Sequence, residues 1–110
     1  MSPALAAAAR NTNIAADNNM VNNARVAAIF RELADLLLEK KDDWFKIRAY
    51  RKVADEIDKL TVDINLLANE NKLRQIPGVG DAIEKKIKEI VATGKLSKID
   101  ELKSDKKENP

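Results

Sequence analysis

"IPGVGDAIEKKIKEI", residues 76–90, joins a glycine-containing turn to a lysine-rich amphipathic stretch, and this junction determines how the neighbouring segments fold. Pro77 lacks an N–H and disfavours helical geometry at the residue before it, so a preceding helix must end here. Gly78 and Gly80 carry no Cβ and can adopt positive φ angles. We therefore predict two helices joined by a tight turn, with the second helix beginning near Asp81.

Apolar residues recur at helical spacing on both sides of this turn, and no segment shows the alternation that is typical of a strand. Asn22 or Asn23 can cap the first helix, and Asp42 with Asp43 can cap the second. The predicted helical segments are residues 22–41, 43–60, 61–75 (built on Ile64, Leu66, Leu67 and Leu73), 81–94 and a short final turn from Ser97 to Lys103. We expect an all-α fold, a compact bundle of four main helices.

The length of 110 residues favours a single domain. Residues 1–20 are rich in Ala and Asn without clear periodicity, and we interpret them as a flexible leader. Residues 21–103 form the predicted domain, and residues 104–110 are interpreted as a frayed tail. The sequence leaves the native origin of the leader open.

Composition excludes several kinds of chemistry. The chain has no cysteine and no histidine, so it cannot form disulfides, Cys or His zinc sites, thiol nucleophiles or a Ser-His-Asp triad. Its net charge of +2 creates no strong overall field, so any basic patch must be local. No apolar run approaches the roughly 20 residues that span a membrane. We expect a soluble protein without a membrane partner, cytoplasmic and nucleoid-associated in a prokaryote or nuclear in a eukaryote.

The turn itself suggests a phosphate-binding site. Amides at a helix N-terminus attract anions, and contacts to a nucleic-acid backbone of this kind carry no base specificity. The predicted donors are the amides of Gly78, Val79 and Gly80, and the cations near them are Arg74, Lys85, Lys86, Lys88, Lys95 and Lys98. Acidic residues lie among these cations and reduce the local positive charge. The alternative to a phosphate-binding turn is a helix–helix corner whose only role is to pack the two helices.

Two segments also resemble a known family. "IPGVGDAIEKKIKEIVATGKLSKIDEL" closely resembles the helix-hairpin-helix of the X-family DNA polymerases, and "FKIRAYRKVADEI" resembles the second helix of the same amino-terminal domain. The likeness covers about residues 22–103 and is stronger to prokaryotic members than to beta-type members. It implies a helix-hairpin-helix over residues 66–93.

The resemblance implies sequence-independent binding of gapped or nicked DNA at a 5′-phosphate end, by a domain of a nucleotidyltransferase that acts in base excision repair or gap filling. Positions that match the family's phosphate pocket and its grip on downstream DNA are Lys46, Tyr50, Arg74, Lys95 and Lys98. Three positions depart from the family. Ala82 replaces a phosphate-binding lysine, Phe45 replaces a base-stacking histidine, and Asp81 places a carboxylate where phosphate would dock.

The resemblance also implies a cation and a reaction. Backbone carbonyls matching Arg74, Ile76 and Val79 hold a sodium or potassium ion in the family, and no other cofactor is required. Lys86 matches the Schiff-base nucleophile with which beta-type members remove a 5′-deoxyribose phosphate.

The helical position of Lys86 is an independent observation. At about 100° per residue, Ile83, Ile87 and Ile90 define a buried stripe. Lys86 falls at the edge of that stripe, where partial desolvation favours a nucleophilic amine, whereas Lys85 points away from it.

Alternatives remain open at this point. The domain could bind DNA without chemistry, or it could be a helical protein–protein adaptor in which the glycines only make a turn. We expect a monomer, because no long heptad pattern is present. We also favour a core position for Trp44. Asp55, Glu56 and Asp58 are interpreted as a solvated face rather than a metal site.

Overall fold

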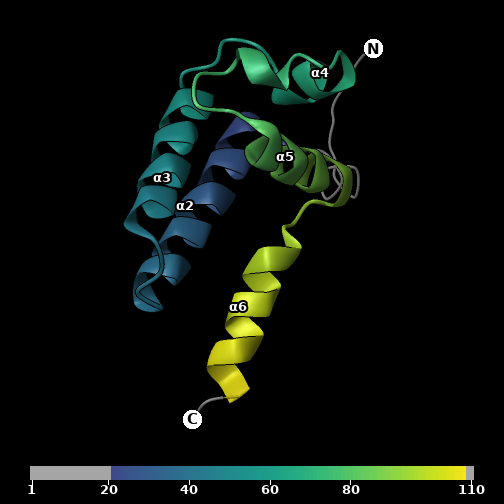
Figure 1. The fold of residues 1–110 in the computed structure, drawn as a ribbon. Coiled ribbons are helices and arrows are strands. Elements are labelled where there is room, and N and C mark those ends of the chain that lie inside the picture. Colours follow the sequence, from purple (N-terminus) through teal and green to yellow (C-terminus); the bar gives the residue numbers. More distant parts are fainter. Residues whose placement is uncertain (1–20, 109–110) are drawn as a thin grey trace.

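The computed structural model describes residues 21–108, which are helical with no strand among them, and this confirms the all-α prediction. The two longest helices, α2 (Asn23–Glu39) and α3 (Trp44–Asp58), pack side by side and supply most of the core (Figure 1). Both begin at predicted caps. The Asn22 side chain accepts a hydrogen bond from the Arg25 N–H at 2.8 Å, and the Asp43 side chain accepts one from the Phe45 N–H at 2.9 Å.

The remaining elements build the hairpin and its extension. They are α4 (Ile64–Asn69), a 3₁₀ turn η1 (Leu73–Gln75), α5 (Asp81–Thr93) and α6 (Ser97–Glu108). The predicted segment 61–75 is therefore divided, because Asn71 adopts a left-handed φ of 58° between α4 and η1. α5 ends at Gly94, as predicted, and α6 packs on α2 and continues to Glu108, beyond the expected short turn. The predicted leader, residues 1–20, lies outside the described residues.

The core joins the hairpin to the long helices. Phe30 of α2 is fully buried and its ring stacks on Tyr50 of α3, with centroids 5.9 Å apart. Ile76 and Val79, on either side of the turn, are 1% and 8% exposed. The turn is thus fixed to the core by apolar side chains that precede and follow Gly78.

Two large apolar side chains of the predicted helices are exposed. Trp44 is 51% exposed, so its predicted core position is wrong, and Leu66 is 49% exposed. At about 100° per residue, Trp44 lies roughly 115° from the centre of the buried stripe that contains Ile47, Tyr50 and Val53. Leu66 occupies a helix of only 6 residues, which turns Ile64 inward and Leu66 outward.

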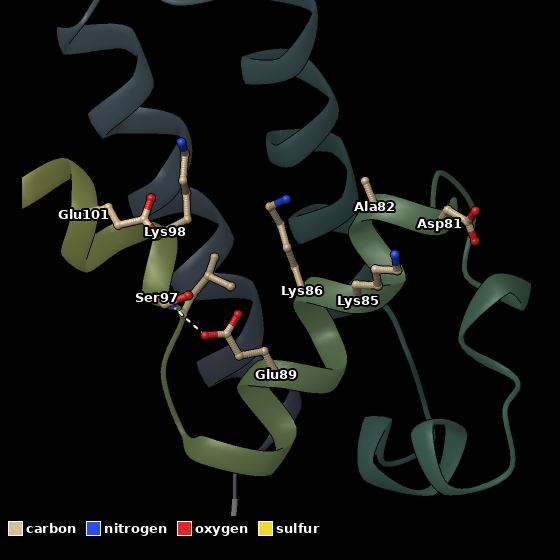
Figure 2. A pocket seen from close by; sticks show the side chains of 9 residues that line it. Asp81, Ala82, Lys85, Lys86, Glu89, Ser97, Lys98 and Glu101 are labelled. Carbon is tan, nitrogen blue, oxygen red and sulfur yellow. Dashed lines mark hydrogen bonds between the residues drawn. The ribbon is translucent and has the colours of Figure 1, made fainter.

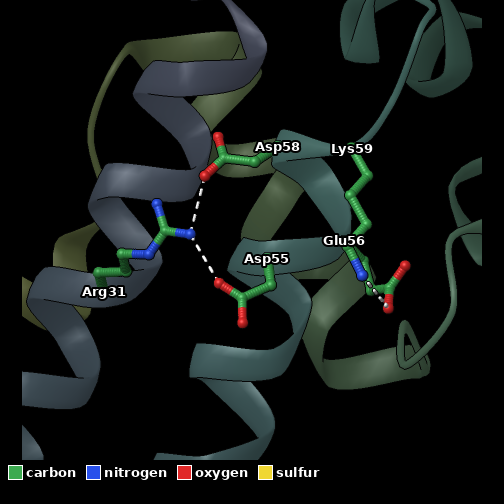
Figure 3. A network of polar contacts seen from close by, with 5 residues as sticks. All are labelled: Arg31, Asp55, Glu56, Asp58 and Lys59. Atoms are coloured by element: carbon green, nitrogen blue, oxygen red, sulfur yellow. Dashed lines mark hydrogen bonds and ion pairs between the residues drawn. The ribbon is translucent and has the colours of Figure 1, made fainter.

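Charged side chains on α2 and α3 form ion pairs at the bundle surface. Arg31 contacts Asp55 at 2.8 Å and Asp58 at 2.7 Å, while Glu56 pairs with Lys59 at 3.7 Å (Figure 3). Hydrogen bonds from the guanidinium to Asp55 and Asp58 raise the pKa of Arg31. The predicted solvated face therefore consists of ion pairs, and no group of three potential metal ligands occurs among residues 21–108. None of the described helices is long and apolar enough to cross a membrane.

Core packing gives a first prediction. Phe30→Ala should lower the free energy of unfolding by about 3–5 kcal/mol, because it removes a buried ring and leaves a cavity beneath Tyr50. Leu38→Ala, at a position that is 47% exposed, serves as the control and should change it by about 0.5 kcal/mol or less. Urea denaturation followed by circular dichroism measures both, and equal effects would contradict this assignment of the core.

Candidate nucleic-acid interface

The hairpin turn uses one of the three predicted donors internally. The Val79 N–H donates to the Ile76 carbonyl at 3.1 Å, and Val79 is buried, so this amide is occupied within the turn. No acceptor for the N–H of Gly78 or Gly80 is found among residues 21–108. Two of the three predicted amides therefore remain available to a ligand.

The start of α5 continues this set of donors. The Glu84 N–H donates to the Gly80 carbonyl at 2.8 Å and closes the first turn of the helix. The N-cap residue is Gly80, which has no side chain to accept a hydrogen bond from the N–H groups of the first turn that follows it. A helix N-terminus without a side-chain cap presents these donors, together with the positive end of the helix dipole, to an anion.

The two glycines serve different purposes. Gly78 has a φ of +90°, a conformation that other residues adopt only with strain. Gly80 has a φ of −109° and a ψ of −164°, which is extended backbone open to any residue, and a Cβ there would meet nothing within 4 Å. The fold therefore requires glycine at position 78 but not at position 80. Because Gly80 has no Cβ, a phosphate can approach the free amides of the turn closely.

Carboxylates neutralise the arginine that precedes the turn. Arg74 contacts Asp81 through its guanidinium, and its Nε lies 3.2 Å from the Glu84 carboxylate. The sequence showed the competing carboxylate of Asp81 but not the contact with Glu84. These two carboxylates compensate the charge of Arg74, so it attracts a phosphate less than a free arginine would.

Lysines from α5 and α6 meet at an open hollow of about 430 Å³ between the two helices. Lys86 and Lys98 project from its two walls, and Lys85 lies further from α6 (Figure 2). Lys86 is half-buried whereas Lys85 is exposed, which confirms the predicted difference between them. The Lys86 Nζ lies 5.8 Å from the centroid of the Tyr50 ring, so the residue that matches the family's nucleophile contacts one that matches its phosphate pocket.

The hollow also contains Glu89, a residue that sequence reasoning did not select. Its Oε2 accepts a hydrogen bond from the Ser97 N–H at 2.8 Å, which caps the start of α6 and fixes the angle between the two helices (Figure 2). Glu89 lies three residues after Lys86, on a neighbouring part of the helix surface. In the sequence, this spacing was the only indication that Glu89 lies near Lys86. The contact with Ser97 gave no such indication, because its N–H belongs to the next helix.

Two other predicted cations lie apart from the hollow. Lys46 is on the first turn of α3, and its Nζ is 3.3 Å from the carboxylate of Asp42, which precedes the helix. A hydrogen bond from the Asp43 N–H lowers the pKa of Asp42, and Lys46 lowers it further. Lys95 is exposed in the loop between α5 and α6 and does not line the hollow.

The carbonyls predicted to hold a monovalent cation lie in and before the hairpin turn. The Ile76 carbonyl already accepts the Val79 N–H, but a carbonyl oxygen has a second lone pair. The carbonyls of Arg74 and Val79 receive no backbone donor within the part of the chain that the structure covers. Each of the three carbonyls therefore keeps at least one free lone pair.

Comparison with known proteins identifies the architecture. Residues 21–96 match the family described as "Helix-hairpin-helix domain". The chain belongs to this family. It is also 32% identical over 85 residues to DNA polymerase lambda of Arabidopsis thaliana, an alignment that covers 77% of the chain and 15% of that polymerase. The helix-hairpin-helix domain thus spans a small part of the length of this relative, and the resemblance to X-family polymerases is confirmed.

The hairpin glycines give a second prediction. In the helix-hairpin-helix domain, Gly78→Ala should cost about 1–2 kcal/mol of unfolding free energy, because alanine is strained at positive φ. Gly80→Ala should change it by about 0.5 kcal/mol or less, because the weaker N-cap is offset by a less flexible unfolded chain. Thermal and urea denaturation of the two variants measure the difference. Equal destabilisation would show that the fold itself requires Gly80.

Proposed function

We propose that this helix-hairpin-helix domain binds the sugar–phosphate backbone of gapped or nicked DNA, independently of base sequence, within an X-family DNA repair polymerase. The observation that carries the proposal is the pair of free amides at Gly78 and Gly80, at the uncapped start of α5. Membership of the family and the similarity to DNA polymerase lambda support DNA as the ligand.

Main-chain donors dominate this proposed interface because the side-chain charges around it are largely compensated. Arg74 is held by two carboxylates, and Lys88 lies 3.9 Å from Glu84. Lys85, Lys95 and Lys98 form no ion pair among residues 21–108, so they are available to neighbouring phosphates. The amides would position one phosphate, and these lysines would contribute attraction that depends on salt.

The DNA proposal gives a third prediction. Fluorescence anisotropy with a gapped duplex should show affinity that falls steeply as salt increases, because binding releases counterions from the phosphates. Gly80→Ala should weaken this binding about tenfold without loss of stability, because its Cβ prevents a charge-assisted hydrogen bond from the turn.

Charge variants provide the matched control. Lys85→Ala should reduce the slope of log affinity against log salt concentration by about one, which corresponds to one lost phosphate contact. Lys103→Ala removes the same charge from α6, where Lys103 pairs with Glu32 at 2.8 Å, and it should leave the slope unchanged. If the wild-type domain fails to bind gapped DNA at low salt, the adaptor alternative is favoured instead.

A second candidate function rests on Lys86, and we propose it as a 5′-deoxyribose phosphate lyase nucleophile. Its amine is half-buried, lies against Tyr50 and opens into the hollow between α5 and α6. The neutral amine would attack the sugar C1′ and form a Schiff base with loss of water. Removal of a C2′ proton would then break the C3′–O bond, and the phosphate would leave with the electron pair.

The residues around Lys86 provide fewer phosphate-binding side chains than the pocket of the family does. Ala82 lines the hollow at the position where the family has a phosphate-binding lysine, so the 5′-phosphate would depend on Lys98 and Lys85. Without this activity, the domain would be a non-catalytic DNA-binding module.

Borohydride trapping tests the lyase directly and is the fourth prediction. The wild-type domain should form a reduced covalent adduct with a 5′-deoxyribose phosphate substrate, and Lys86→Ala should lose more than about 90% of it because the Schiff-base amine is absent. Lys88→Ala removes an exposed lysine from the same helix and should retain the adduct. An adduct that persists in Lys86→Ala would reject Lys86 as the nucleophile.

We further propose that the domain acts as a monomer. We also propose that the carbonyls of Arg74, Ile76 and Val79 bind a potassium or sodium ion beside the bound phosphate. The cation would complement the negative charge of the strand without using a side-chain ligand.

A further inference from the structure

The start of α5 places carboxylates beside the free amides of the hairpin. Asp81 and Glu84 both lie in the first turn of the helix, which begins directly after Gly80. Both contact the guanidinium of Arg74, which reaches them from the 3₁₀ turn before the hairpin. Carboxylates at a helix N-terminus stabilise the helix through its dipole, and here they also lie at the end where an anion would bind.

The two carboxylates differ in their exposure. The Glu84 side chain is 17% exposed and also lies 3.9 Å from the Lys88 amine, so two cations offset its charge. The Asp81 side chain is 81% exposed, and Arg74 is its only ion-pair partner within the described part of the chain. Figure 2 shows Asp81 at the start of α5, directed away from α6. A ligand that approaches the hairpin from solvent therefore meets the carboxylate of Asp81 rather than that of Glu84.

Side chains supply no excess of positive charge at this end of α5. The ion-paired group consists of two cations and two carboxylates, so together these side chains are formally neutral. An anion is attracted instead by the free amides of Gly78 and Gly80 and by the helix dipole. That dipole is equivalent to about half an elementary charge, which favours a singly charged anion.

The phosphates of a DNA strand differ in charge according to their position. An internal phosphodiester carries a single negative charge, whereas a terminal phosphate monoester carries about −1.5 to −2 at neutral pH. A second negative charge at the hairpin would find no free cation and would lie beside Asp81. We propose that Asp81 is a specificity-determining residue, which restricts the hairpin to internal phosphodiesters and rejects a terminal monoester.

This inference rests on the proposed binding of DNA by the hairpin and adds the class of phosphate that the hairpin accepts. A terminal monoester is better accommodated in the hollow between α5 and α6, because Lys85 and Lys98 line it without an ion-pair partner among residues that the structure describes. Glu89 and Glu101 also line the hollow, and the carboxylate of Glu89 is occupied in capping α6. Asp81 would thus set the register of a strand, with an internal phosphate at the turn.

Amide resonances report on the hairpin directly, because the chain has only 3 glycines. Gly78 and Gly80 lie at the turn, and the Gly94 N–H, which donates to the Ile90 carbonyl at 2.7 Å, serves as the internal reference. Thymidine 5′-monophosphate carries a terminal monoester, whereas the dinucleotide thymidylyl-thymidine carries a single internal phosphodiester. Titration of the isotope-labelled full chain with each compound at neutral pH, followed by two-dimensional NMR, gives both affinities at the two hairpin amides.

The wild-type chain should bind the dinucleotide about threefold more tightly than the mononucleotide at these amides. Removal of one carboxylate charge at about 6 Å in water should strengthen binding of a singly charged phosphate about threefold and of a doubly charged one about tenfold. Asp81→Asn should therefore abolish the preference for the dinucleotide, whereas Asp81→Glu keeps the charge and should keep the preference.

Asp100→Asn is the matched control, because it removes the same charge from the first turn of α6 and should leave the preference unchanged. If Asp81 only stabilises the helix, Asp81→Asn will alter thermal stability without altering the preference. That result, or equal affinity of the wild-type chain for both compounds, would refute the inference while a blunt duplex that shifts Gly78 and Gly80 still supports the hairpin function. If neither the dinucleotide nor the duplex shifts these two resonances, the proposed hairpin contact fails as well.

Discussion

The burial of Ile76 and Val79 on either side of Gly78 is the constraint on which the rest of the structure depends. These two side chains fix both ends of the turn to the core, and Gly78 connects them with a left-handed φ of +90° that glycine adopts without strain. The remaining amides are then held at the surface. Because the donors are positioned by packing, an anion that binds there does not have to order the loop first.

Ion pairing determines which of the many charges remain for a ligand. Arg31, Arg51, Lys46 and Arg74 all contact carboxylates, so they contribute little field beyond their own partners. Among residues 21–108, the cations without an ion pair include Lys85, Lys95 and Lys98 near the hairpin and Arg48 and Lys52 on α3. A chain with a net charge of only +2 can thus offer two local basic surfaces, although its overall composition suggests none.

The helices were predictable from sequence wherever a cap or a breaker marked their ends. Asn22, Asp43, Pro77 and Gly94 each act through their immediate neighbours, so local rules locate them well. The division of residues 61–75 was not predictable, because a left-handed Asn71 leaves no signal in the apolar pattern. Trp44 was misassigned for a related reason. At the first residue of a helix, hydrophobicity alone does not show on which side of the buried stripe a side chain falls.

The candidate site was predictable in its α5 residues but not in its contacts between elements. Helical spacing alone placed Lys86 at the edge of the buried stripe and Lys85 outside it. Spacing could not show that Glu89 caps α6 through Ser97, or that Arg74 is held by Glu84, because both contacts depend on how separate segments pack.

Tyr50 connects the core to the lysine that borders the hollow. Its ring stacks on Phe30 with centroids 5.9 Å apart, and the Lys86 Nζ lies 5.8 Å from the same ring. The same ring thus belongs to the core and to the contact with Lys86, so the packing of α2 against α3 contributes to where this amine lies beside the hollow.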